Sequence, residues 1–196
     1  RILLLAENSI EHLIVFVSTL RYGATIATVN VEMNEAHLTE ILCAINPILV
    51  IYQSDLGLEK FATNGPGVWI EIGEWKKGRE AQVAGLFSEL ATLSDNDTPS
   101  ISKPDDQGVI FYTSGTVSKP KGVIQTHATA YFNYDSTADY LALESGVKTL
   151  DCRSYSWLSA QHMSLGAPLV AGATTVFAKH FSRSQYFSWL KDHDIN

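Results

Sequence analysis

The sequence predicts an α/β protein with parallel-rich sheets and helices on both faces. Short apolar runs alternate along all 196 residues with segments in which apolar residues recur at helical spacing. This alternation is typical of parallel strands that are connected by helices. Hydrophobic residues make up 45% of the chain, which is enough for one core or for two small fused ones.

The apolar runs give the expected order of the elements. Strands are expected at residues 1–5, 24–29, 48–52, 68–72, 109–112, 123–125, 150–155 and 174–178. Helices are expected at residues 9–22, 35–45, 56–61, 80–90, 128–141, 162–170 and 182–193. The polar, proline-containing segment 94–104 is the best internal boundary. It divides the chain into a first α/β lobe at residues 1–98 and a second α/β segment at residues 99–196.

Capping residues support several of these helices. Asn8 or Ser9 can cap the first helix, and Gly23 stands where a C-terminal glycine is expected. Asn34 can cap the second helix, which Asn46 and Pro47 would end. The core face of the first helix is expected to comprise Ile10, Leu13, Ile14, Val17 and Leu20, and that of the last helix Tyr186, Phe187 and Leu190.

Charge and composition exclude several classes of protein. The chain has 21 acidic and 14 basic residues, a net charge of -7, and no basic stripe of the kind that binds nucleic acid. No run approaches the ~20 apolar residues that span a bilayer, so no transmembrane segment is expected. The opening run Arg1–Leu5 is interpreted as a core strand, and both ends suggest a fragment of a longer chain. Cys43 and Cys152 are expected to be unpaired thiols in the cytoplasm.

The segment from Tyr112 to Val123 concentrates groups that bind phosphate. It offers the hydroxyls of Thr113, Ser114, Thr116 and Ser118, the glycines Gly115 and Gly122, and the cations Lys119 and Lys121. Successive backbone N–H groups in such a turn can form an anion-binding nest. The order of residues is not that of a Walker A loop, because Lys121 precedes Gly122. The segment therefore predicts a phosphate site that follows a strand, with an ordinary surface turn as the alternative.

The run Tyr112-Thr113-Ser114-Gly115-Thr116 followed by Pro120-Lys121-Gly122-Val123 resembles the phosphate-binding signature of the adenylate-forming superfamily. This superfamily includes acyl-CoA synthetases, firefly luciferase and nonribosomal peptide adenylation domains. The resemblance extends to residues 1–52 and to 166–174, so it covers most of the chain but only part of the family's N-terminal domain. Val117-Ser118 departs from the usual Thr-Gly and removes one glycine from the loop.

A second departure concerns the acyl pocket. Trp157 stands near the position of a histidine that shapes the acyl and nucleotide pocket in relatives. Trp157 either lines an acyl pocket or fills the core. His162 is a nearby substitute for that histidine or a structural residue, and Gln161 is a further candidate for substrate contact.

The resemblance implies an enzyme that works in two steps with ATP, Mg²⁺ and coenzyme A. A carboxylic acid is activated as acyl-adenylate and then transferred to a thiol. Thr113, Ser114, Gly115, Thr116, Ser118, Lys121 and Gly122 would bind the nucleotide, with Thr116 and Lys121 catalytic and Thr116 near the metal. The acceptor is coenzyme A or a carrier-protein thiol, and the identity of the acid stays open. The alternative is a non-catalytic nucleotide-binding or purely structural fragment, and the isolated chain is expected to be inactive.

Overall fold

The computed structural model describes residues 1–73, 85–90, 93–94, 96, 98–113 and 120–196. Six strands form one sheet in the order β4-β3-β1-β2-β5-β6. These strands are β1 (Ile2–Leu5), β2 (Ile26–Thr28), β3 (Leu49–Tyr52), β4 (Val68–Glu71), β5 (Gln107–Thr113) and β6 (Lys121–Thr126). Every pairing in this sheet is parallel except β5 with β6, so the expected parallel-rich α/β fold is confirmed.

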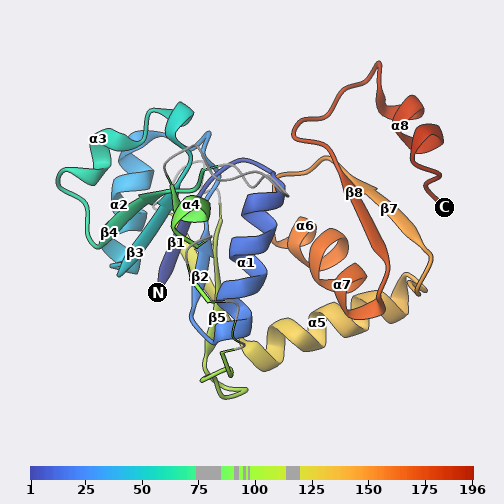
Figure 1. Cartoon of the computed structure of the whole chain (residues 1–196), viewed down its shortest axis with the longest axis horizontal. Helices are drawn as coiled ribbons and strands as arrows, with labels where there is room; N and C mark the ends of the chain where they lie inside the picture. Colours follow the sequence, from blue (N-terminus) through green and yellow to red (C-terminus); the bar gives the residue numbers. More distant parts are fainter. Residues whose placement is uncertain (74–84, 91–92, 95, 97, 114–119) are drawn as a thin grey trace.

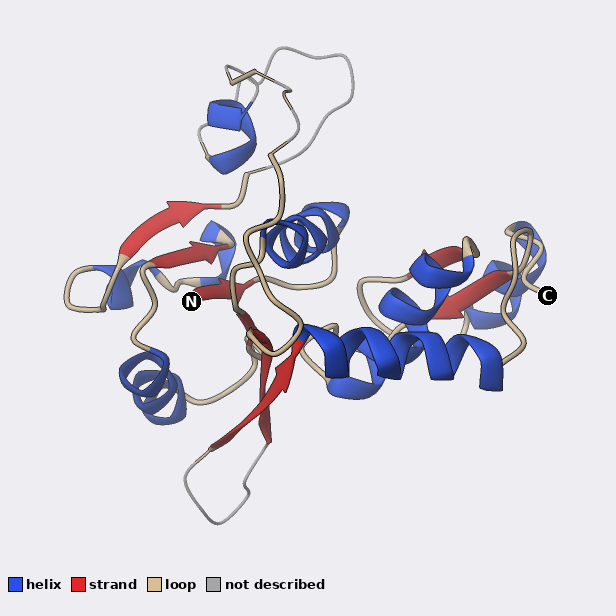
Figure 2. Ribbon diagram, turned by 90° about the horizontal axis from the view of Figure 1, so that it is seen from below, coloured by secondary structure: helices blue, strands red, loops and turns tan. Residues whose placement is uncertain are grey.

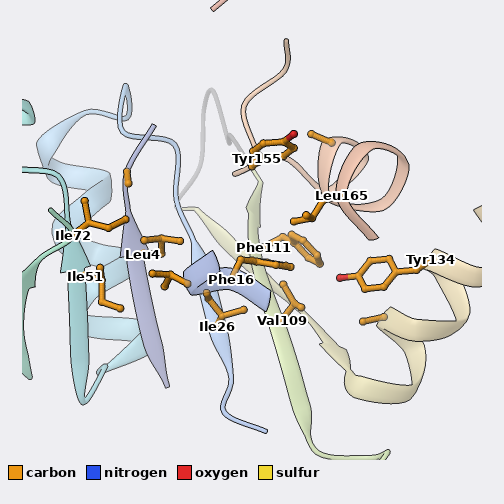
Figure 3. Close-up of a cluster of buried hydrophobic side chains, with 14 of the residues drawn as sticks. Leu4, Phe16, Ile26, Ile51, Ile72, Val109, Phe111, Tyr134, Tyr155 and Leu165 are labelled. Carbon is orange, nitrogen blue, oxygen red and sulfur yellow. The ribbon is translucent and has the colours of Figure 1, made fainter. Parts of the chain in front are cut away.

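Helices cover both faces of this sheet (Figure 1). One face packs on α1 (Ile10–Tyr22), α4 (Leu86–Leu90) and α5 (His127–Tyr140) through a cluster that includes Phe16, Phe111 and Tyr134. Figure 3 shows this cluster around Leu4, Ile26 and Val109. The other face packs on α2 (Glu35–Ile45), and further along the chain lie the short 3-10 turn η1 (Ser54–Leu56) and α3 (Glu59–Ala62).

A smaller parallel sheet follows α5 and contains β7 (Lys148–Asp151) and β8 (Thr174–Phe177). Between its strands lie α6 (Leu158–Ala160), the π-helical turn η2 (Gln161–Gly166) and α7 (Ala167–Ala171), which form one continuous run of helix beside α5 (Figure 2). The last helix is α8 (Tyr186–Asp192). No helix of the described residues is long and apolar enough to cross a membrane.

The large sheet extends across the expected boundary between residues 98 and 99. Strands β5 and β6 come from the second expected segment, yet β5 pairs with β2 of the first. β7 and β8 instead form their own sheet after α5. The division of the chain into two lobes at this boundary stays a prediction. Along the chain, the strands of the large sheet end at Thr126, and the later strands belong to the small sheet.

The caps of the first two helices were correctly predicted. Ser9 accepts a hydrogen bond from the backbone N–H of His12, and Gly23 ends α1 with a φ of 97°. Asn34 caps α2 in the same way, and Asn46 ends it in the left-handed region. Cys43 is exposed, Cys152 is half-buried, and both are free thiols.

Two predicted core faces were partly wrong. The most buried residues of α1 are His12, Val15, Phe16 and Thr19, whereas Ile10 is 49% exposed. Phe187 is 77% exposed, and α8 has no buried residue. The reason is that α1 is apolar around most of its circumference, whereas α8 lies beside the narrow sheet β7–β8. Of the predicted helix 80–90, residues 80–84 lie outside the described part of the chain.

Candidate functional site

The segment that the sequence predicts to bind phosphate connects β5 to β6 at the carboxyl end of β5. Because β5 is parallel to β2, this end lies on the sheet edge where α/β proteins bind ligands. Thr113 ends β5 and lies opposite Lys121, which begins β6. Both side chains are exposed. Ser114, Gly115, Thr116, Ser118 and Lys119 lie outside the described residues, so their predicted roles stay predictions.

Thr113 and Lys121 project from the same face of the sheet. Residues that lie directly opposite in an antiparallel pair share a face, and alternate residues of a strand return to it. Phe111 therefore shares this face, as does Gln125 in β6. A hydroxyl and an ammonium group thus lie opposite each other where the two strands enter the connecting loop, an arrangement that suits an anion.

Gly122 lies opposite Tyr112 on the other face of the hairpin. A Cβ atom at Gly122 would lie 3.2 Å from the Cζ and Oη atoms of Tyr112. Burial raises the pKa of Tyr112. The ring of Tyr112 thus covers the glycine, and this packing gives Gly122 a structural role that the sequence did not indicate.

His162 lies against the hairpin. Its Nε2 atom is 3.2 Å from Oε1 of Gln125. Its ring meets Phe111 and Tyr134 edge-on, with centroid distances of 6.1 Å and 5.5 Å. Burial lowers the pKa of His162, which favours the neutral ring and an Nε2–H that donates to Gln125.

Gln161 and Trp157 have opposite environments. Gln161 is fully buried, and its amide donates to Thr28 Oγ1 at 2.6 Å and to the backbone carbonyl of Tyr155 at 2.5 Å. Both of its amide hydrogens are therefore committed to the protein. Trp157 is 53% exposed at the start of α6, so the alternative in which it fills the core is wrong.

A partly buried ion pair that the sequence did not indicate holds η2 to the second sheet. Asp151 is 5% exposed and accepts hydrogen bonds from the backbone N–H of Arg153 at 2.7 Å and from its Nη2 at 2.5 Å. The Ser164 hydroxyl also donates to Asp151. Burial would raise the pKa of Asp151, but the hydrogen bonds from Arg153 and Ser164 outweigh it, and the net pKa lies below the ordinary value.

We expect Asp151→Asn to destabilise the fold by about 2 kcal/mol. The substitution removes the charge that Arg153 neutralises and offers Ser164 and Arg153 one acceptor oxygen in place of two. Arg153 is about one third exposed, so water compensates part of the loss. Urea unfolding of Asp151→Asn measures the effect, with the exposed Asp139→Asn in α5 as control. Equal midpoints for both variants would contradict this interpretation.

Asn8 and His12 connect the turn after β1 to the segment after β7. Asn8 donates to the carbonyl oxygen of Arg153 at 2.6 Å and accepts from the backbone N–H of Tyr155 at 2.8 Å. His12 Nδ1 lies 3.1 Å from the carbonyl oxygen of Ala6, and its ring centroid lies 6.0 Å from that of Tyr155. Burial lowers the pKa of His12 to about 4. The sequence does contain one indication that His12 is buried. It stands three and four residues before Val15 and Phe16, on the face of α1 that packs into the core.

A cavity of about 600 Å³ lies at the carboxyl ends of β1, β3 and β4. Its lining includes Glu11, Asp55, Glu71 and Lys179. Lys179 is already paired with Glu7, the two charged groups being 2.5 Å apart. An excess of carboxylates repels polyphosphate. The hairpin therefore suits a nucleotide phosphate better than this cavity does.

The described residues contain no group of three His, Cys, Asp or Glu side chains that could hold a metal ion. A metal at the hairpin would therefore depend on ligand oxygens from its substrate, as Mg²⁺ does when it keeps waters and phosphates as ligands. The exposed Thr113 hydroxyl at the end of β5 fits this chemistry, since a hard cation prefers oxygen ligands.

The fold is that of a mainly parallel α/β protein, with the predicted phosphate-binding segment at the carboxyl end of β5. The chain belongs to the AMP-binding enzyme family, whose model matches residues 1–196. This family is that of the adenylate-forming ligases.

Known relatives include coenzyme A ligases and peptide synthetases. The chain is 21% identical over 205 residues to 4-chlorobenzoate–CoA ligase of Arthrobacter sp., covering 96% of this chain and 35% of that protein. It is 26% identical over 174 residues to tyrocidine synthase 3 of Brevibacillus parabrevis, covering 88% of this chain and 2% of that one. ATP-bound MatB from Rhodopseudomonas palustris has the same fold, with a TM-score of 0.84, 20% identity, and coverage of 97% and 37%. The chain thus spans about a third or less of these relatives.

Proposed function

We propose that this chain carries the ATP phosphate site of an AMP-forming ligase that activates a carboxylic acid and transfers it to coenzyme A. The observation that carries the proposal is the hairpin β5–β6, which presents Thr113 and Lys121 together at the carboxyl edge of the sheet. Its sequence carries the hydroxyls, glycines and lysines that a polyphosphate requires. Membership of the AMP-binding family supports ATP as the nucleotide.

The proposed reaction begins when a carboxylate oxygen attacks the α-phosphorus of ATP. A phosphorus–oxygen bond forms to the acid, and the bond to pyrophosphate breaks. The charge on the leaving pyrophosphate is stabilised by donors and cations that are already in place. Lys121 would supply the cation, and the Thr113 hydroxyl would donate a hydrogen bond. In a second step a thiol attacks the acyl carbon and AMP leaves.

Ser114, Gly115, Thr116, Ser118 and Gly122 complete the proposed nucleotide site. Mg²⁺, when bound, would neutralise charge on the phosphates, and Thr116 is the proposed ligand from the loop. Lys121 and Thr116 are the residues to which we assign catalysis. Trp157 is the remaining candidate for the acyl pocket, since it is exposed.

The acceptor thiol is proposed to be that of coenzyme A. 4-Chlorobenzoate–CoA ligase, which aligns with 96% of this chain, supports this choice. A carrier-protein thiol is the second candidate, because tyrocidine synthase 3 also matches most of the chain. The two free cysteines favour a reducing, cytoplasmic setting for the parent protein. Because the chain spans about a third of its ligase relatives, we further propose that turnover requires additional chain.

We expect the chain to bind ATP and Lys121→Ala to weaken binding about tenfold or more, because the variant removes a cation next to the phosphates. Isothermal titration with ATP and with pyrophosphate measures this loss. Lys103→Ala is the matched control, since Lys103 is an exposed lysine just before β5, away from the loop. Equal affinity for ATP in both variants would contradict the proposed phosphate site.

Activity separates the proposed enzyme from its alternatives. We expect no pyrophosphate release by the chain alone with a panel of carboxylic acids. A longer protein that continues this sequence should release pyrophosphate and lose this activity in Lys121→Ala. If the longer protein binds ATP without turnover, the alternative of a non-catalytic nucleotide-binding module is correct.

A further inference from the structure

His162 spans both strands of the β5–β6 hairpin from outside the sheet. Its ring packs edge-on against Phe111 of β5, and its Nε2 faces Oε1 of Gln125 in β6 at 3.2 Å. Tyr134 of α5 meets the ring edge-on, at a centroid distance of 5.5 Å. Edge-to-face aromatic pairs and a hydrogen bond together restrict the ring in position and in rotation.

The face that His162 contacts is the one from which Thr113 and Lys121 project. Phe111 precedes Thr113 by two residues, and Gln125 follows Lys121 by four, so strand alternation places all four on one face. His162 therefore contacts β5 two residues from Thr113 and β6 four residues from Lys121. The hydrogen bond and the ring contacts of His162 are with Gln125, Phe111 and Tyr134.

The turn η2 holds His162 firmly. Gln161 bonds to Thr28 at the end of β2, and Ser164 donates to Asp151 of β7. The Thr175 hydroxyl of β8 donates to the backbone carbonyl of Ser164 at 2.7 Å. A π-helical turn inserts a residue into an α-helix and is frequent at functional sites. Here neighbouring residues of this turn, Gln161 and His162, both reach the large sheet.

We propose that His162 is a positioning residue that couples the second sheet to the phosphate-binding hairpin through Gln125 and Phe111. It holds β6 so that Lys121 stays beside Thr113, and it does not itself contact the substrate. The effect of His162 on ATP binding rests on the proposed ATP site. The restraint of β6 by His162 is inferred from the contacts of His162 alone.

The first test measures hydrogen exchange without any nucleotide. In His162→Ala the amides of β6, such as that of Val123, should lose protection about tenfold, whereas the amides of β1 and β3 keep theirs. His193→Ala is the matched control, because His193 is exposed at the end of α8. Unchanged protection in β6, or an equal loss across the whole sheet, would overturn the proposed restraint.

The second test measures ATP affinity. His162→Ala and Gln125→Ala should each raise the Kd for ATP about three- to tenfold, the worth of one hydrogen bond. The double variant should be no worse than His162→Ala alone, because His162→Ala already removes the contact that Gln125 makes. Additive losses, or none in His162→Ala, would overturn the coupling. If the unaltered chain binds no ATP, the proposed site fails, and the exchange experiment still decides whether His162 restrains β6.

Discussion

Gly166→Ala should destabilise the protein by about 3 kcal/mol, although alanine favours a helix by about 1 kcal/mol over glycine. Gly166 lies in η2 directly against α5. A Cβ atom at this position would lie 2.1 Å from Cδ1 and 2.3 Å from Cγ of the Tyr134 ring. Tyr134 is only 8% exposed, so its ring has little room to move. Overpacking of this kind moves a helix or a ring, and either movement costs stability.

Thermal or urea unfolding measures the effect of Gly166→Ala. Ser159→Ala, at an exposed position of the preceding helix α6, is the control and should be neutral within about 0.5 kcal/mol. Substitution of the residue with which the new Cβ would clash, Tyr134, provides a further check. Tyr134→Ala destabilises the chain by itself, and Gly166→Ala should add almost nothing in that background. A stabilised Gly166→Ala variant would show that helix propensity dominates.

Acidification from pH 6.5 to pH 4 should remove about 3 kcal/mol of stability through His12 alone. Burial lowers the pKa of His12 from 6.5 to about 4. The unfolded chain therefore binds more protons than the folded chain in this range. The contribution is complete above pH 6.5 and is lost as the pH falls to 4. Protonation also places a charge beside Tyr155, whose hydroxyl has no partner among the described residues.

Urea unfolding at several pH values measures this dependence. His12→Gln should abolish most of the slope between pH 6.5 and 4.5, and His193→Gln, at an exposed position at the end of α8, should leave it unchanged. Glu7 and Asp151 also have lowered pKa values, but a carboxyl group with a lowered pKa loses its contribution only below its unfolded value near pH 4. An unchanged slope in His12→Gln would show that His12 does not control this range.

Local signals in the sequence predicted the elements of the fold well. Ser9, Gly23 and Asn34 act at helix ends because capping depends on a few neighbouring residues. The order of the strands could not be predicted in the same way. β5 pairs with β2 although 78 residues lie between Thr28 and Gln107. Tertiary packing, rather than any local sequence pattern, determines which strands become neighbours at such a separation.

The candidate site was predicted only in part. The strand that precedes the loop was predicted from its apolar run and ends at Thr113, whereas the phosphate-binding role of the loop stays a prediction. His162 was considered as a substrate contact, but its partner Gln125 lies 37 residues earlier and no spacing links the two. Gln161 and Asp151 are similar cases. Their roles depend on burial against distant elements, which a single polar residue in the sequence does not reveal.

Several apolar side chains on helices of the second half of the chain are exposed, and this too depends on tertiary packing. Tyr131 and Phe132 of α5 and Phe187 of α8 are each more than half exposed, and of these only Phe187 was expected on a core face. A helix buries only the face against which another element packs. For α8 this element is a sheet with two strands, which is too narrow to cover an apolar stripe.

Assigned amide NMR spectra recorded during an ATP titration test the central claim most directly. We predict that shifts concentrate at Thr113, at Lys121 and Gly122, and to a smaller extent at His162. Pyrophosphate should shift the same amides and adenosine should not, because the phosphates make the contact. Shifts that gather instead around Ser9 and Lys179, which line the acidic cavity, would contradict the account, as would an unchanged spectrum at saturating ATP.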